Sequence, residues 1–211
     1  MNKNIAITLL TWNDWENTVV CLESIFQNDY QNFDVVLINQ GSEKFHIEKI
    51  KDWALNKIEI KDKEIHYNKN KTIPIIDITN DSKIYSKSNR NIYLINLEKN
   101  IGLAPGVNLG FNFGIVNKYD LCARIDCDFI VTKDYLKSME SIFNSDSEIV
   151  AASPKIKHAY LRNTIWWCGF KSTWSYLKFQ RTMNLKKKRI MDNENYKGLI
   201  ETDAIAGCCS F

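Results

Sequence analysis

Short apolar runs alternate with helical stripes along most of this chain. Residues 5–10 (IAITLL) and 33–38 (FDVVLI) are nearly continuous apolar runs, which is typical of central strands in a parallel sheet. The segment between them carries an apolar stripe at helical spacing, formed by Val19, Leu22, Ile25 and Phe26. A strand, a helix and a second strand in this order predict a parallel pair joined by a right-handed crossover. The expected fold class is therefore α/β, with a mostly parallel central sheet flanked by helices.

The same alternation resumes after a polar interruption. Residues 58–90 are rich in Lys, Asn, Asp and Ser, and we expect an excursion there, with a minor hairpin at the apolar island 73–78. The remaining segments predict helices over 46–56 and 133–143, and strands over 91–96, 120–125 and 148–154. Together these elements make residues 1–211 a single domain.

Composition and charge narrow the class of protein. The chain has 211 residues, of which 45% are hydrophobic and 25% charged, as in a globular domain. A net charge of +3 gives no support for a nucleic-acid partner. The one dense basic run, KKKR at 186–189, is either a solvated loop or a contact for an anionic membrane surface or a phosphorylated acceptor.

Cysteine usage and hydropathy bear on the compartment. The six cysteines form no C-x-x-C pair, which indicates reduced thiols. No apolar stretch reaches the roughly 20 residues that a membrane helix needs. We therefore expect a cytoplasmic protein, and peripheral association with a membrane stays open.

A glycine stripe follows the strand predicted at 91–96. If Pro105 opens a helix, Gly106, Gly110 and Gly114 fall on one face, and each costs about 1 kcal/mol relative to alanine. Such a cost indicates a close approach, either of the sheet or of a bound ligand. The spacing is not the G-x-G-x-x-G dinucleotide motif, so NAD is not predicted.

Two aspartates end the strand predicted at 120–125. Alternation along a strand would turn Asp126 and Asp128 toward one spot beyond its carboxyl end. Mg²⁺ or Mn²⁺ would relieve the repulsion between them, because these ions take oxygen ligands. The alternative is a pair of solvated turn residues.

An aromatic-rich stretch lies further along the chain, and its residues are Trp166, Trp167, Phe170, Trp174 and Tyr176. Aromatic residues at this density form either part of the core or a wall for a sugar ring.

Four separated stretches together resemble one family. They are TWNDWENTVVCLESIFQNDYQNFDVVLINQGS (11–42), NLEKNIGLAPGVNLGFNFGI (96–115), ARIDCDFIVTKDYL (123–136) and ETDAIAGCCSF (201–211). In order and approximate spacing they are similar to the family-2 glycosyltransferases of GT-A fold, and most similar to the rhamnosyltransferase-like branch that builds bacterial surface polysaccharides. The resemblance covers the chain apart from residues 58–90. It implies transfer of a sugar from a UDP- or dTDP-sugar donor to a glycan or lipid-linked acceptor, with inversion and with Mn²⁺ or Mg²⁺.

The resemblance also assigns roles to residues. The residues that it places against the nucleotide and donor are Thr11, Trp12, Asn13, Asn39, Asn100, Gly102, Asn108 and Asp126. Asn39 stands where the family usually has Asp, which leaves base recognition chemically feasible but the identity of the base open. Asp126 would contact the ribose or the donor sugar in the catalytic centre, and Asp128 would bind the metal.

The catalytic base is less well defined. In the family it usually lies beyond the glycine-rich strand that matches 204–211, so we expect the acceptor and base segment to be missing from this chain. Asp203 is our candidate for a catalytic, acceptor-side role, and Glu201 is a weaker one. Both are otherwise solvated residues at the start of a strand.

Two other functions remain compatible with the sequence. A sugar-phosphate nucleotidyltransferase would also use metal-binding aspartates, but it carries a glycine-rich basic loop where this chain has TWNDWE (11–16). A non-catalytic domain that binds a nucleotide sugar would explain Asn39 and the absent acidic motif.

Overall fold

The computed structural model describes residues 2–69, 71–79, 82–84, 90–161, 163–169, 172–175, 178–181, 190–193 and 197–211, with the backbone alone at 172–175 and 178–181. Its main sheet has the strand order β11-β5-β1-β2-β4-β3. The strands are β1 (Ile5–Thr11), β2 (Phe33–Asn39), β3 (Ile75–Ile78), β4 (Ile92–Asn96), β5 (Leu121–Ile125) and β11 (Cys209–Ser210). All neighbours are parallel except β11, which pairs antiparallel with β5. The predicted parallel strand–helix–strand unit is confirmed.

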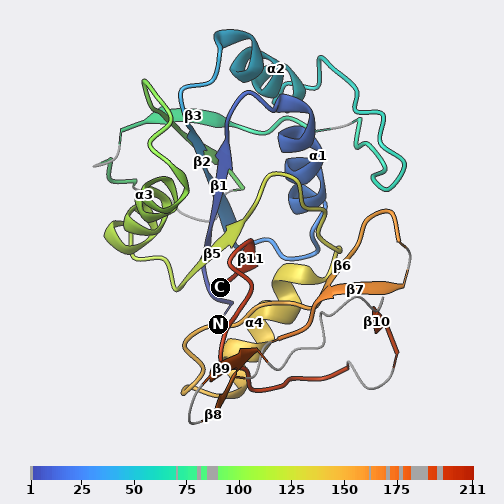
Figure 1. Cartoon of the computed structure of the whole chain (residues 1–211). Helices are drawn as coiled ribbons and strands as arrows, with labels where there is room; N and C mark the ends of the chain where they lie inside the picture. The colour runs from blue at the N-terminus through green and yellow to red at the C-terminus, as the bar shows by residue number, and fades with distance from the viewer. Residues whose placement is uncertain are drawn as a thin grey trace.

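Helices cover both faces of this sheet (Figure 1). One face packs against α1 (Trp15–Phe26), α2 (Lys44–Ala54) and α4 (Tyr135–Ser145), with a core that includes Leu22, Trp53 and Leu136. The other face packs against α3 (Leu103–Val116) around Phe113. Strand alternation explains the division, because odd-numbered residues of β1 face the first core and Ala6 faces the second.

The glycine stripe of α3 lies against the sheet. A Cβ at Gly106 would lie 2.6 Å from the Nε2 atom of Gln40, and one at Gly110 would overlap the side chain of Thr8. At Gly114 it would overlap the Sγ atom of Cys122. The sheet, and not a ligand, is therefore the partner that these three positions accommodate.

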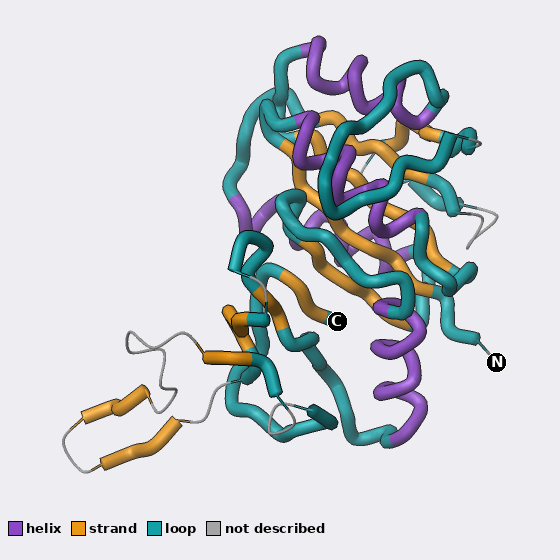
Figure 2. Tube along the Cα trace, turned by 90° about the vertical axis from the view of Figure 1, so that its right-hand side faces the viewer, coloured by secondary structure: helices purple, strands orange, loops and turns teal. Residues whose placement is uncertain are grey.

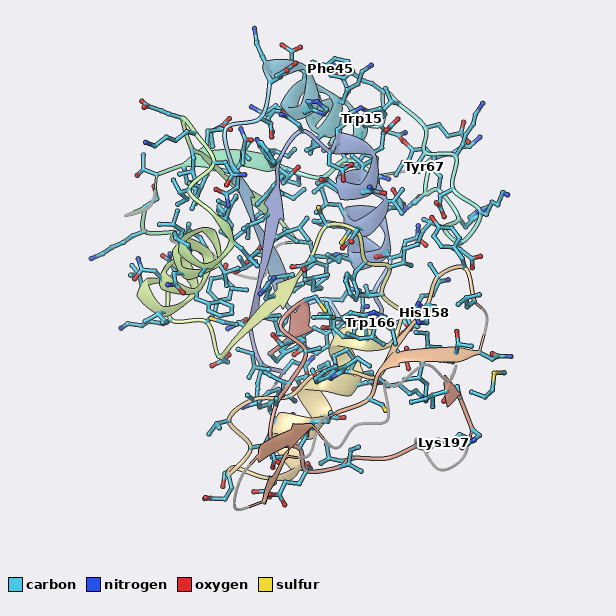
Figure 3. All side chains as sticks on the ribbon, viewed as in Figure 1. Trp15, Phe45, Tyr67, His158, Trp166 and Lys197 are labelled. Carbon is cyan, nitrogen blue, oxygen red and sulfur yellow. The ribbon has the colours of Figure 1, made fainter. Side chains whose placement is uncertain are left out.

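The polar excursion is part of the domain. The predicted hairpin at 73–78 is wrong, because β3 pairs in parallel with β4 and adds an edge strand to the main sheet. Ile75 and Ile78 pack against the two cores there, which a free hairpin would not supply. Tyr67 lies beside α1 (Figure 3), and its hydroxyl donates to the carbonyl of Ile58 at 2.7 Å.

A buried carboxylate fixes this excursion to the helices. Glu23 of α1 is fully buried and accepts hydrogen bonds from Trp53 Nε1 (2.9 Å) and the backbone N–H of Asn68 (3.1 Å). Lys71 completes the site with an ion pair to Glu23. Its Nζ atom lies 4.6 Å from the centroid of the Trp53 ring and 4.2 Å from that of Tyr67. One acidic side chain thus connects α1, α2 and residues 67–71.

The last third of the chain forms smaller sheets. β6 (Ile156–Lys157), β7 (Thr164–Trp167) and β10 (Ile190–Met191) make one, and β8 (Ser172–Ser175) with β9 (Lys178–Arg181) makes another that stands apart from the main sheet in Figure 2. The strand predicted over 148–154 is wrong, because this segment has no strand and its Val150 is 90% exposed.

The aromatic stretch is only partly described. Trp166 is half-exposed and lies near His158 in Figure 3, whereas Trp167 is more deeply placed against the main core. Phe170 and Tyr176 lie outside the described residues, as does the side chain of Trp174. Among the helices that the structure describes, none is long and apolar enough to cross a membrane.

Candidate functional site

Hydrogen bonds join the loops that follow β1 and β2. Asn13 adopts a left-handed conformation (φ 52°), which asparagine tolerates better than most residues. Its backbone N–H donates to Ser42 Oγ at 3.0 Å, and its side-chain Oδ1 accepts from the N–H of Glu43 at 2.8 Å. The two loops therefore form one connected rim at the carboxyl edge of the sheet.

Thr11 and Asn39 end the two strands beneath this rim. Thr11 is buried, and its hydroxyl shares a 2.8 Å hydrogen bond with that of Thr18. Asn39 is also buried; its Oδ1 accepts from the N–H of Ser42 at 2.9 Å and its Nδ2 donates to Asn96 at 3.0 Å. The Asn39 amide thus shapes the turn, and among the described residues one N–H of its Nδ2 atom is hydrogen-bonded and the other has no partner.

The rim also carries an exposed aromatic side chain. Trp12 is 57% exposed although it directly follows the buried Thr11. A large apolar side chain in this position adds nothing to the core, and an indole face is a stacking surface for a planar ring. The geometry is therefore compatible with the predicted nucleotide contact of Trp12.

Gln40 connects a third loop to this edge, although no pattern in the sequence singles this residue out. Its Nε2 donates to the carbonyl of Gly102 at 2.9 Å, and its Oε1 accepts from the N–H of Ile101 at 3.1 Å. Asn100 closes the same loop by accepting from the N–H of Gly102 at 2.8 Å. Gly102 itself has φ 90°, a conformation that side-chain-bearing residues rarely adopt. Asn100 and Gly102 are thereby placed beside the end of β2.

Replacing Gln40 with methionine should destabilise the protein by about 1–3 kcal/mol, because it removes two part-buried hydrogen bonds to the backbone of residues 101 and 102, each worth about 0.5–1.5 kcal/mol. The free energy of unfolding in urea measures this. A methionine variant as stable as the wild type would show that the two backbone groups find water, and that Gln40 does not hold the loop.

The two predicted metal-site aspartates lie where β5 ends. β5 stops at Ile125, and residues 126–129 form a turn closed by a hydrogen bond from the N–H of Phe129 to the carbonyl of Asp126 (3.2 Å). The N–H of Asp126 still donates to the carbonyl of Cys208 at 2.8 Å. Strand alternation therefore does not place Asp128, and that part of the sequence argument is wrong; the turn sets its position.

The two carboxylates influence each other within this turn. Burial raises the pKa of Asp126, the Arg124 guanidinium lowers it, and the negative charge of Asp128 raises it again, with a net increase. The side chain of Asp126 is 34% exposed, and Asp128 is exposed. Positive charge brought to this turn would favour the ionised form of Asp126.

A third acidic residue lies near the turn. Asp14 caps α1 by accepting a hydrogen bond from the N–H of Asn17 at 3.3 Å. The pKa of Cys127 is raised to about 11, first by burial and then by the negative charge of Asp14. In the described parts of the chain, no three His, Cys, Asp or Glu side chains form a group that could hold a metal ion. A Mg²⁺ or Mn²⁺ ion at Asp128 would need further oxygens from a substrate, which is common for ions held by one or two carboxylates and phosphates.

Other predicted residues lie away from this group. Asn108 is exposed on the outer side of α3, because the glycines take the inner side. Glu201 and Asp203 are exposed in the segment that leads to β11, and only Cys209–Ser210 of the expected 204–211 strand is a strand. Their roles stay predictions that this geometry does not strengthen.

Comparison with solved structures settles the fold. The mannosyltransferase PcManGT from Pyrobaculum calidifontis, in complex with GDP-Man and Mn²⁺, superposes with a TM-score of 0.52 and 14% sequence identity, over 75% of this chain and 36% of that one. The chain has the GT-A fold. TarS from S. aureus superposes with a TM-score of 0.52 and 15% identity, over 80% of this chain and 24% of that one. The chain thus spans less than half the length of either protein.

The comparisons of sequence add nothing to this result. No protein-family model matches the chain, and no curated protein matches it.

Within this GT-A fold, Thr11 and Asp126 lie at the switch point of the sheet. β1 is central, with β2 on one side and β5 on the other, and the chain returns to β5 through α3 on the opposite face (Figure 1). Ligands of open α/β sheets bind beyond the carboxyl ends of strands at such a point. Because Arg124 pairs with Thr8, Asp126 and Thr11 follow at the ends of adjacent strands.

Proposed function

We propose that the chain binds a nucleoside-diphosphate sugar together with Mg²⁺ or Mn²⁺ and transfers the sugar to a glycan or lipid-linked acceptor. The observation that carries this is the turn of Asp126 and Asp128 at the switch point, beside the rim formed by the loops after β1 and β2. The GT-A fold and the Mn²⁺ and GDP-Man bound to the mannosyltransferase support it.

Within the proposal, residues of the rim receive the nucleotide. Trp12 stacks on the base, and the remaining N–H of Asn39 meets a carbonyl of the base. Asp126 accepts from a hydroxyl of the ribose or donor sugar. The resemblance to the rhamnosyltransferase-like branch favours UDP or dTDP, and the mannosyltransferase adds GDP to the nucleotides worth testing.

The transfer step needs charge stabilisation and a base. Asp128, which is exposed and carries a carboxylate, would hold the cation, and a bound cation neutralises the charge that develops on the leaving diphosphate. Asp203 is proposed to accept the proton of the acceptor hydroxyl, on the face opposite the leaving group, which gives inversion.

Calorimetric titration tests the proposal. UDP, dTDP and GDP are titrated into the full chain with and without Mn²⁺, and at least one should bind in a metal-dependent manner. Mn²⁺ alone should give little heat, because the described residues supply no group of three ligands. Absence of metal-dependent binding for all three nucleotides would refute the proposal.

A second candidate is binding without transfer. It is favoured by Asn39, whose amide is already used in two hydrogen bonds within the protein. Incubation with UDP-, dTDP- and GDP-sugars in Mn²⁺, followed by an assay for released nucleoside diphosphate, separates the candidates. Release that depends on both the protein and Mn²⁺ shows turnover, and binding without any release favours the non-catalytic role.

A further inference from the structure

Arg124 is a nearly buried cation on a strand, and the function proposed above gives it no role. Its side chain is 15% exposed, and its backbone lies between Thr8 of β1 and Ser210 of β11. A charge so far from water is costly unless it is paired. In the described part of the chain, the hydrogen bonds of its guanidinium all go to Asp126.

The pairing with Asp126 uses one oxygen only. The Nε and one terminal nitrogen of Arg124 both donate to Oδ1 of Asp126, at 3.1 and 2.8 Å. No hydrogen bond to Oδ2 is found among the described residues, although the carboxylate is two-thirds buried. Two donors on one oxygen fix the rotation of the carboxylate and leave Oδ2 available to accept another hydrogen bond.

The neighbouring backbone restricts the position of the Arg124 guanidinium. The N–H of Asp126 is bonded to the carbonyl of Cys208, and a Cβ at Gly207 would lie 3.6 Å from the remaining terminal nitrogen of Arg124. The guanidinium therefore lies between Asp126 and residues 207–208.

We propose that Arg124 is a positioning residue that holds Asp126 by Oδ1 so that Oδ2 accepts a hydrogen bond from the ribose hydroxyls of the nucleotide. This inference rests on the proposed nucleotide binding. It assigns recognition of the sugar hydroxyls of the nucleotide to two residues acting together, Arg124 and Asp126.

The test compares UDP with 2′,3′-dideoxy-UDP by calorimetry in Mn²⁺, using the full chain. The wild type should bind UDP more tightly, by about tenfold or more, because a hydrogen bond to a carboxylate is lost with the hydroxyls. Asp126→Ala and Arg124→Met should each lose this preference. Arg124→Lys, which keeps the charge and one donor, should restore part of it. The double variant should lose no more than either single variant, because the two residues act through one contact.

The outcomes separate this inference from the proposed function. A wild type that binds none of UDP, dTDP and GDP in Mn²⁺ refutes nucleotide binding itself; if GDP alone binds, GDP and 2′,3′-dideoxy-GDP replace the uridine pair in this test. A wild type that binds both equally, or an Arg124→Met variant that keeps the full preference for UDP, overturns the role of Arg124 while nucleotide binding stands. A purely structural role would lower the melting temperature of Arg124→Met without changing the ratio of the two affinities. Lys137→Met, an exposed cation on α4, is the matched control for the loss of charge.

Discussion

Replacing Asp128 with alanine is expected to abolish the metal-dependent part of nucleotide binding. Asp128 is the exposed carboxylate of the turn, whereas one oxygen of Asp126 is already occupied by Arg124. Loss of a residue that merely orients a metal ligand typically weakens metal binding about 10- to 100-fold, so loss of the ligand itself should cost at least as much. Titration of UDP, dTDP and GDP in Mn²⁺ measures the change, and Asp128→Asn separates loss of charge from loss of size.

Asp203→Ala is the matched control for this variant. It removes the same charge from another exposed position, and a residue on the acceptor side should leave donor binding intact. Affinity that falls equally in the Asp128 and Asp203 variants would contradict the proposed division of roles. Binding that survives in Asp128→Ala with its metal dependence unchanged would remove Asp128 from the metal site.

The pattern of hydrophobic positions in the sequence was sufficient to predict the central strands and the helix face that packs on them. The continuous apolar runs at 5–10 and 33–38 could be satisfied only by burial on both faces, and β1 and β2 have that environment. The glycine stripe likewise required a close neighbour, and its spacing matched one helix face. The run at 148–154 also has apolar residues at its centre, but Val150 is exposed and only Ala152 reaches the main core, so its apolar residues alone predicted a strand that does not form.

The candidate site was only partly accessible from the sequence. Asp126 and Asp128 stand out because they follow an apolar strand, and Asn13 and Asn39 because they break one. Gln40 carries no such signal: its amide bonds to residues 101–102, far along the chain, and only the sheet topology brings them together.

The polar partners of buried charges could not be predicted either, because only the fold brings them together. Arg124 reads as an ordinary strand residue until its contact with Asp126 is seen, and Glu23 reads as a polar position on an amphipathic helix. Both are buried charges, and what makes burial tolerable is a partner that periodicity does not identify. The sequence therefore predicts an excursion with a minor hairpin at 58–90, without its attachment to Glu23.

Breaking the ion pair between Glu23 and Lys71 should be the most destabilising single change outside the apolar core. Glu23 is fully buried and the side chain of Lys71 is 8% exposed, so removal of either partner leaves an uncompensated charge in the interior. Such changes typically cost about 3–5 kcal/mol. Glu23→Gln and Lys71→Met are therefore each expected to lower the free energy of unfolding by about that amount, as measured by chemical denaturation.

The double variant distinguishes an ion pair from a general defect of packing. Once Glu23 is neutral, Lys71→Met removes a cation that no longer has a partner, so the combined loss should be well below the sum of the single losses. Glu48→Gln, which affects only the exposed pair of Glu48 with Lys44, is the control and should leave stability unchanged within error. Additive losses in the double variant would show that the two side chains contribute separately. In that case Glu23 would act through its hydrogen bonds to Trp53 and Asn68, which Lys71→Met leaves in place.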